Sequence, residues 1–271
     1  MTSWIDGRPA DSLSVTDRGL AYGDGLFETI AVKSGRPLLL ERHLQRLASG
    51  CRRLSIAADQ ALIHSELLSF AAQLGDGVMK LIVTRGDSLR GYAPAPQAQP
   101  RRILQGGPAP VYPQAHGELG VTLFACATRL AEQPLLAGLK HLNRLEQVLA
   151  RSEWQDTAYA EGLMCDTAGR VVEGVYSNLF LVKNGVLLTA DLSRCGVAGV
   201  MRAELLAQAQ ALGIATEVRD IQMTDLEPAD EVFLCNSVYG VWPVKGFAQL
   251  NWSVGPLTRK LRGIARALLD V

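Results

Sequence analysis

A cluster of prolines divides this chain into two parts and limits the folds that it can adopt. Six of its 12 prolines fall between Pro94 and Pro113, interrupted only by the short predicted strand RRILQG. Proline fixes φ and removes a backbone donor, so regular structure in this stretch is confined to that strand. The sequence therefore predicts a smaller N-terminal α+β domain over residues 1–107, a connector over 108–119 and a larger C-terminal domain over 120–271.

The N-terminal part mixes strands with helices. Asp6-Gly7 predicts a hairpin turn in WIDGRPA, and KSGR predicts a second hairpin between FETIAV and PLLL. Residues 41–54 carry apolar side chains at spacings of three and four, which indicates a helix with one buried face. A second helix is expected over about 59–74, followed by a strand at VMKLIVTRG.

The C-terminal part begins with a strand at VTLFACAT and a helix over 143–154 that carries Leu145, Val148 and Leu149 on one face. Further helices are expected over 200–212 and from Gly255. Strands are expected at AYAEGLMCD, RVVEG, the hairpin NLFLVKNGVLLTA, TEVRDI and DEVFLCN. Strands that gather in clusters, rather than alternating strictly with helices, predict two α+β domains.

The composition is that of an ordinary globular protein. Of 271 residues, 48% are hydrophobic and 20% charged, and Lys+Arg and Asp+Glu both number 27. Nucleic acid and membrane are therefore not expected as partners. MTSWIDGRPADS lacks the pattern of a secretory signal, and five scattered cysteines without CxxC spacing favour reduced thiols in the cytoplasm. The four histidines show no metal-ligand spacing, so no metal is expected.

One lysine, Lys140, stands among Leu136, Leu139 and Leu142 in LAGLKHLNRLEQVLAR. A buried ammonium without a partner is costly and tends to lose its proton. The neutral amine is then a nucleophile that forms a Schiff base with carbonyls, as pyridoxal phosphate requires. The plainer interpretation is that the stem packs on the leucines and the amine extends into water.

Other segments offer the remaining groups that this cofactor needs, an acid for the pyridine nitrogen and donors for the phosphate. Glu173 ends the apolar strand RVVEG, where it could meet a cationic ring or simply face water. Gly196 and Gly199 precede a helix whose N-terminus could bind a phosphate. Ser237 follows a strand and could add a hydroxyl, although polar residues often simply end strands.

Seven segments resemble, in order, the class IV aminotransferase family of pyridoxal phosphate enzymes. They are YGDGLFET (22–29), RHLQRL (42–47), RGDSLRGY (85–92), LKHLNRLEQVLAR (139–151), EGVYSNLF (173–180), GVAGVMR (196–202) and CNS (235–237). The resemblance implies fold type IV, a two-domain α+β fold like that of the D-amino-acid aminotransferases, with each domain a mixed sheet or barrel with helices. It also implies a homodimer that acts on a small molecule.

The resemblance gives each matched residue a role. Lys140 matches the lysine that forms the internal aldimine, and Glu173 matches the carboxylate that keeps the pyridine nitrogen protonated. Arg46 matches the arginine that grips the phosphate; its alternative is a solvated helix face, the role assigned to Arg42. The rest of the cofactor set comprises the backbone of Val200 and Met201, the side chain of Ser237, and Asn178 beside the ring.

Within the family, KHLNRLEQVL resembles the aminodeoxychorismate lyases, since many of the aminotransferases have tyrosine where this chain has Arg144. Thr29 stands where aminotransferases tend to have glycine or valine, and its hydroxyl could move a proton. The plainer interpretation of Thr29 is a strand residue that faces a neighbour. Arg90 and Tyr92 lie where related enzymes bind a substrate carboxylate. Arg144 is either a further such contact or a partner of Glu146.

The implied reaction converts 4-amino-4-deoxychorismate to 4-aminobenzoate and pyruvate, in folate biosynthesis. Lys140 would remove the C4 proton, and Thr29 or Lys140 would protonate the leaving group. The alternative is transamination of a D- or branched-chain amino acid. A non-enzymatic binding module is disfavoured because Lys140, Glu173 and Arg46 are all present.

Overall fold

The computed structural model describes residues 2–88, 91–95 and 97–269, and the chain divides into two compact units. The first contains Met1–Pro110 together with Leu139–Asn143, and the second contains Val111–Gly138 together with Arg144–Val271. Leu139–Asn143 belong to the first unit, although the residues on either side of them belong to the second. The predicted domains, which were consecutive ranges of residues, did not include this return of the chain.

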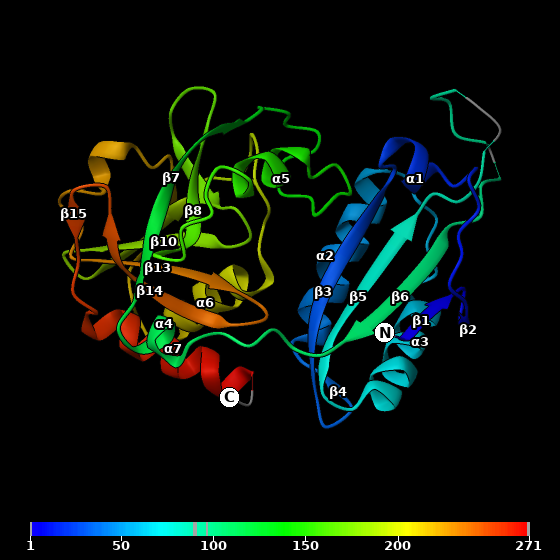
Figure 1. Cartoon of the computed structure of the whole chain (residues 1–271), viewed down its shortest axis with the longest axis horizontal. Helices are drawn as coiled ribbons and strands as arrows, with labels where there is room; N and C mark the ends of the chain where they lie inside the picture. Colours follow the sequence, from blue (N-terminus) through cyan, green and yellow to red (C-terminus); the bar gives the residue numbers. More distant parts are fainter. Residues whose placement is uncertain (1, 89–90, 96, 270–271) are drawn as a thin grey trace. The chain divides into compact units, whose positions relative to one another are not determined.

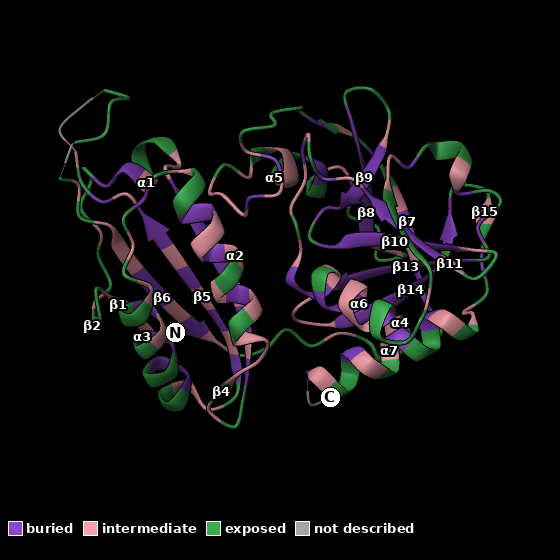
Figure 2. Ribbon diagram, turned by 180° about the vertical axis from the view of Figure 1, so that it is seen from behind, coloured by how far each residue is buried: buried purple, intermediate pink, exposed green. Residues whose placement is uncertain are grey.

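The first unit is a six-stranded antiparallel sheet with two long helices on one face (Figure 1). The strands, in spatial order, are β2 (Arg8–Pro9), β1 (Thr2–Ile5), β6 (Arg101–Gly107), β5 (Gly77–Thr84), β3 (Gly25–Lys33) and β4 (Arg36–Pro37). The helices are α2 (Leu40–Arg53) and α3 (Gln60–Leu74), with a short α1 (Arg18–Tyr22) before β3. Figure 2 shows that α2 carries both buried and exposed residues, as expected of a helix with one buried face.

Both predicted hairpins of the first unit are confirmed, with β1 paired to β2 and β3 paired to β4. The expectation of a strand throughout PLLL is wrong. Only Arg36–Pro37 pairs with β3, because Leu39 adopts a left-handed conformation, with φ of 53°, and α2 begins at Leu40. The helix α1 was not expected from the sequence; the Asp17 side chain caps it by accepting from Gly19 N and Leu20 N.

The second unit is a nine-stranded sheet, part of which closes into a ring. Its strands are β7 (Val121–Leu130), β8 (Tyr159–Asp166), β9 (Val171–Gly174), β10 (Asn178–Lys183), β11 (Val186–Ala190), β12 (Thr216–Arg219), β13 (Glu231–Asn236), β14 (Gly240–Phe247) and β15 (Leu250–Asn251). The order is β12-β11-β10-β13-β14-β7-β8-β9, with β15 paired to β14 beside this path, and β9 also pairs with β10. That last pairing closes the ring, so the expected mixed sheet or barrel is confirmed for this unit.

Strand β14 was not predicted from the sequence, and Pro243 lies within it. Proline lacks an N–H and argues against a strand inside a sheet. Here it stands opposite Phe233 of β13, while Val244 begins the parallel pairing with Val121 of β7.

The helices of the second unit are α4 (Gln114–Glu118), α5 (Leu145–Arg151), α6 (Val200–Ala211) and α7 (Pro256–Leu268), with a 3-10 turn η1 (Met223–Asp225). Helix α5 is shorter than the predicted 143–154. Its Leu145, Val148 and Leu149 form an apolar face that is 75%, 58% and 60% exposed in the single chain.

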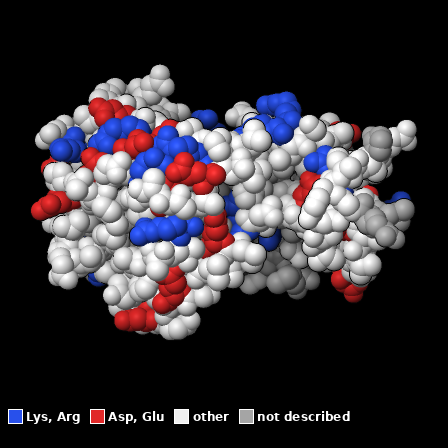
Figure 3. Space-filling view, turned by 90° about the horizontal axis from the view of Figure 1, so that it is seen from above, with Lys and Arg blue, Asp and Glu red and all other residues white. Residues whose placement is uncertain are grey.

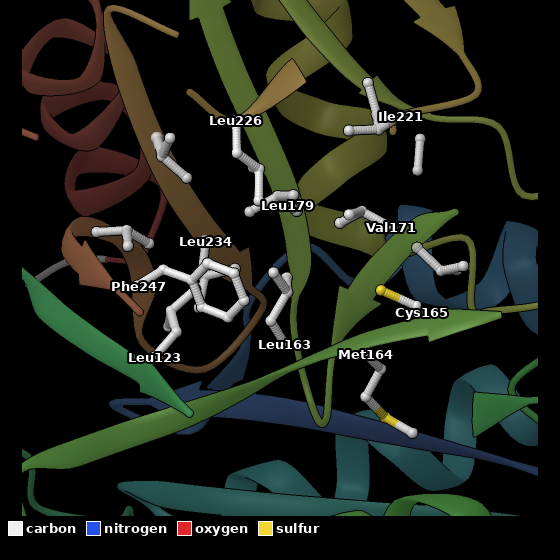
Figure 4. Packing of buried hydrophobic residues seen from close by; sticks show 14 of the residues in the cluster. Leu123, Leu163, Met164, Cys165, Val171, Leu179, Ile221, Leu226, Leu234 and Phe247 are labelled. Atoms are coloured by element: carbon white, nitrogen blue, oxygen red, sulfur yellow. The ribbon is translucent and has the colours of Figure 1, made fainter. Parts of the chain in front are cut away.

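The core cluster of the second unit consists mainly of side chains from the strands of its ring. Leu123, Leu163, Leu179 and Leu234 from four strands pack with Phe247 in this cluster (Figure 4). On the molecular surface, acidic and basic side chains lie close together on the face drawn in Figure 3, consistent with the balanced charge. In the described part of the chain, none of the helices has the length and apolar character that crossing a membrane requires.

Candidate active site

Lys140 lies in a short extended segment that pairs with the beginning of β3. The Phe27 amide N donates to the Lys140 carbonyl O over 2.9 Å, and the Leu142 N donates to the Gly25 O over 3.0 Å. Leu26 and His141 form an antiparallel bridge between these two bonds. Main-chain hydrogen bonds therefore hold the backbone of Lys140 in place.

A glycine makes room for the end of this segment. The Asn143 Nδ2 donates to the Gly23 carbonyl O over 3.2 Å. Gly23 has a φ of 65°, and a Cβ built there would lie 2.5 Å from the Asn143 Oδ1. The first glycine of YGDG thus supplies both a left-handed backbone and the space that the Asn143 amide occupies.

The Lys140 amine faces an aromatic ring on β3. Its Nζ lies 4.4 Å from the centroid of the Phe27 ring, a distance typical of a cation–π contact. Side chains alternate along a strand, so Thr29 lies on the same face of β3 as Phe27. Lys80 of β5 stands directly opposite Thr29, and its Nζ is 5.0 Å from the Phe27 centroid. Two lysines and one hydroxyl therefore share this face of the sheet.

Lys80 was not among the residues selected from the sequence. The strand VMKLIVTRG was predicted, and its alternation places Lys80 on the face opposite to the buried Met79 and Leu81. Whether Lys80 and Thr29 lie on the same face of the sheet, however, depends on the register between β3 and β5, which the sequence does not give.

On the other face of β3, Glu28 is only 1% exposed and meets two residues of α2. Its Oε1 accepts from the Arg46 Nε over 2.8 Å, and its Oε2 contacts the His43 Nδ1 at 2.6 Å. Arg46 Nη2 also donates to Glu28 Oε2, which completes a two-pronged ion pair. Burial by itself raises the pKa of Glu28, but Arg46, and then His43, lower it to about 2. Arg46, predicted to grip a phosphate, is therefore held by an ionised carboxylate.

His43 is 1% exposed and lies against the same carboxylate. Burial lowers the pKa of the imidazole, while Glu28 raises it and Arg46 and Lys140 lower it further. The net direction is downward. The Nδ1–H donates to Glu28, because an ionised carboxylate can only accept.

In the second unit, Glu173 is a buried carboxylate at the end of β9, with 3% exposure. Its Oε2 accepts from the Val197 N over 2.9 Å and from the Asn178 Nδ2 over 3.3 Å. The Asn178 Nδ2 also donates to the Val197 carbonyl O over 2.9 Å. The interpretation of Glu173 as an edge residue in water is therefore wrong, because the loop before α6 covers it.

The N-terminus of α6 adjoins this carboxylate through Asn178. Helix α6 begins at Val200 after Gly199, and a Cβ built on Gly199 would lie 1.9 Å from the Asn178 Oδ1. The backbone N–H groups of Val200 and Met201 belong to the first helical turn, which has no intrahelical acceptors for them. They are a donor pair suited to an anion. Ser237 directly follows β13, whose Cys235 pairs with Asn178.

The predicted substrate residues have different surroundings. Arg144 immediately precedes α5, and burial lowers the pKa of its guanidinium while Glu173, then Glu146, act in the opposite direction. The Glu146 Oε1 accepts from the Ala131 N over 2.8 Å. Tyr92 is 86% exposed. Arg90 lies outside the described residues.

These groups fit pyridoxal phosphate. The first unit offers a lysine amine against an aromatic ring and an arginine fixed by a carboxylate. The second offers a buried carboxylate beside a helix N-terminus that lacks a side chain at Gly199. A lysine, an acid and anion donors are the groups that the cofactor requires.

Comparison with known families gives the family of this chain. The family described as Amino-transferase class IV matches residues 25–247. The chain belongs to this family. Class IV aminotransferases have the two-domain α+β architecture of fold type IV, and the family depends on pyridoxal phosphate.

Two relatives of this class IV chain are lyases. A crystal structure of 4-amino-4-deoxychorismate lyase from Pseudomonas aeruginosa is 65% identical, with a TM-score of 0.98, and the match covers 99% of this chain and 100% of that one. Aminodeoxychorismate lyase from Vibrio harveyi is 37% identical over 96% of this chain and 98% of its own length. A D-alanine aminotransferase from Bacillus licheniformis is 26% identical over 93% of this chain and 89% of its own length.

Proposed function

We propose that this chain is a pyridoxal-phosphate-dependent lyase that converts 4-amino-4-deoxychorismate to 4-aminobenzoate and pyruvate, a step of folate biosynthesis. The likeness to the P. aeruginosa enzyme, 65% identical over 99% of this chain, supports this function. The observation that carries the proposal is the face of β3 that carries both Thr29 and Phe27, whose ring contacts the Lys140 amine. A candidate base and a candidate hydroxyl donor are thereby assigned to the same face of this strand.

The cofactor is assigned to a defined set of residues. Lys140 attaches it covalently, and Glu173 holds the proton on its pyridine nitrogen. When bound, the cofactor withdraws electrons from the carbon that carries the substrate amine. The phosphate is assigned to Arg46, to the backbone N–H groups of Val200 and Met201 and to the Ser237 hydroxyl, with Asn178 beside the ring.

The remaining chemistry consists of two proton movements. The Lys140 amine, released when the substrate amine takes its place, removes the proton from C4 of the substrate. The bond between C3 and the enolpyruvyl oxygen then breaks, and the departing group receives a proton from Thr29 or from Lys140. The products contain all the atoms of the substrate, so no second substrate is needed. Aromatisation of the remaining ring drives the step.

The substrate has two carboxylates, and cations are assigned to them. Arg90 and Arg144 are the predicted partners, with Tyr92 as a further contact. Lys80 joins this set because it stands opposite Thr29 on the same face of the sheet. Arginine binds a carboxylate with two parallel hydrogen bonds, whereas lysine acts as a point charge.

We further propose a cytoplasmic homodimer. The exposed apolar residues of α5, Leu145, Val148 and Leu149, support association with a second copy, because a contiguous apolar face is unfavourable in water.

The second candidate is transamination of a D- or branched-chain amino acid. The match to a D-alanine aminotransferase over 93% of this chain supports it, since the same cofactor groups serve either chemistry. The two reactions differ in products, because only transamination transfers an amino group to a 2-oxo acid.

The decisive experiment supplies 4-amino-4-deoxychorismate to the purified, cofactor-loaded protein and measures pyruvate and 4-aminobenzoate. Equal release of both is expected. The Lys140→Ala variant should release neither, and borohydride treatment should leave no cofactor attached to it by mass spectrometry. The aminotransferase would be established instead by two results together. The wild-type protein would release neither product, and it would convert 2-oxoglutarate to glutamate with a D- or branched-chain amino acid as the amino donor.

A further inference from the structure

The buried face of β3 carries an ionic cluster formed by Glu28, His43 and Arg46. One carboxylate serves both helix residues, because Oε1 pairs with Arg46 Nε while Oε2 is shared by Arg46 Nη2 and His43 Nδ1. The side chains of Arg46 and Glu28 are 14% and 2% exposed. His43 and Arg46 are three residues apart on α2, so they project from the same side of the helix.

Stability alone does not explain a cluster of this kind. Removing two charges from water is costly, and apolar residues of similar size often serve a core equally well or better. Glu28 alternates with Leu26 and Ile30, both buried, on a strand face where an apolar residue would fit the pattern.

The geometry instead determines the orientation of a guanidinium. A carboxylate that accepts from both Nε and Nη2 fixes the plane of the arginine and the direction of its remaining nitrogen. His43 supports the same carboxylate with a second hydrogen bond, so Glu28 cannot rotate without losing a buried partner.

We propose that Glu28 and His43 are positioning residues, which hold the Arg46 guanidinium in the orientation that binds the cofactor phosphate. The inference rests on the proposed function, in which Arg46 is a phosphate ligand. Neither residue is assigned a contact with the cofactor, and the proposed effect of each passes through Arg46. Glu28 occupies the strand position immediately before Thr29, so one strand orients the arginine on one face and presents the hydroxyl on the other.

The same unit contains a matched control. The Arg102 Nε and Nη2 donate to the two oxygens of Glu66 over 2.8 and 3.0 Å. The side chains of Arg102 and Glu66 are 15% and 10% exposed, close to the values for Arg46 and Glu28. Glu66→Gln removes an equivalent ion pair between α3 and β6, at residues to which no cofactor role is assigned.

The test is titration of cofactor-free protein with pyridoxal phosphate, followed by the absorbance of the bound cofactor. Glu28→Gln should raise the Kd by about 10- to 100-fold, by analogy with the loss of a group that orients a metal-binding residue. Glu66→Gln should leave the Kd unchanged. His43→Gln, which keeps the Glu28–Arg46 pair, should raise it by about 3- to 10-fold, the effect of losing one typical hydrogen bond.

A double-mutant cycle separates positioning from general destabilisation. Lysine cannot form the two-pronged pair, so Glu28→Gln should add little to the Kd of Arg46→Lys. Wild-type protein that binds no cofactor would overturn the proposed function, and this inference with it. Wild-type protein that binds the cofactor, with Glu28→Gln and His43→Gln no weaker than Glu66→Gln, would overturn the inference alone. Fully additive effects of Glu28→Gln and Arg46→Lys would also overturn it.

Discussion

Phe27 and Lys140 contact each other through both backbone and side chain. The Phe27 amide donates to the Lys140 carbonyl over 2.9 Å, and the Lys140 Nζ lies 4.4 Å from the Phe27 ring centroid. One residue of β3 therefore fixes the backbone of the lysine and provides the surface that its amine faces.

Replacing Phe27 with leucine should separate these two contacts. The backbone hydrogen bond and most of the apolar volume remain, but the ring is lost. A cation–π contact contributes about 0.5–2 kcal/mol, so turnover of 4-amino-4-deoxychorismate should fall by about 2- to 30-fold. Steady-state product release measures the effect, and Phe27→Tyr, which keeps an aromatic face, is the control. Equal turnover of the leucine variant and wild type would show that the ring is not needed.

Thr29 is predicted to supply a hydroxyl rather than bulk. Thr29→Val keeps the branched shape on β3 and removes the hydroxyl, so turnover should fall by about 10²- to 10⁴-fold if this group transfers the proton. Cofactor affinity, measured by absorbance titration, should not change. Thr29→Ser should retain most of the activity. A valine variant with wild-type turnover would assign both proton transfers to Lys140.

Local turn chemistry explains why the hairpins could be predicted from the sequence. Asn184 and Gly185 have φ of 51° and 76°, and Asp6 and Gly7 have 50° and 77°. Asparagine, aspartate and glycine tolerate these left-handed conformations better than other residues, so their pairs mark two-residue turns.

Long-range pairing explains what could not be predicted. The bonds between Leu139–Asn143 and the start of β3 join residues more than a hundred positions apart, and no local pattern indicates them. The ion pair of Glu28 and Arg46 had a partial signal, since a glutamate between Leu26 and Ile30 on a strand calls for a buried partner. The roles of Arg46 and Glu173 in binding the cofactor stay predictions.

Arg18 is a buried cation that ties α1 to the loop after β5. It is 3% exposed. It donates to Asp24 Oδ2 (2.7 Å), Ser88 Oγ (3.0 Å), Gly91 O (3.0 Å) and Tyr92 O (2.8 Å). Asp24 is also paired with Arg85, over 2.8 Å. Four acceptors therefore receive hydrogen bonds from the Arg18 guanidinium, and of these Asp24 also has Arg85 as a partner.

Arg18→Met should therefore lower the free energy of unfolding by about 3 kcal/mol, the lower end of the range for a broken buried ion pair. Urea denaturation measures the change. Arg194→Met is the control, because the Arg194 side chain is 30% exposed and its Asp220 partner is 41% exposed. An exposed pair of this kind contributes less than about 1 kcal/mol. Similar losses in both variants would contradict the assigned role of Arg18.

Glu161 is a carboxyl group inside the second unit, with 0% exposure and no assigned catalytic role. Burial raises its pKa from 4.5 to about 8. Hydrogen bonds act in the opposite direction, and the donors are Gly162 N (3.0 Å), Ser177 Oγ (2.9 Å), Tyr176 N (3.4 Å) and Val175 N (3.1 Å).

The folded chain therefore keeps a proton on Glu161 that the unfolded chain releases near pH 4.5. The stability that this proton contributes is fully present below pH 4.5 and is lost as the pH rises toward about 8. Glu161→Gln cannot ionise, so its free energy of unfolding should decline less across this window. Urea denaturation at several pH values measures the slope. Glu217→Gln, at a side chain that is 56% exposed, should keep the wild-type slope. If Glu161→Gln also kept the wild-type slope, another group would have to carry the titration.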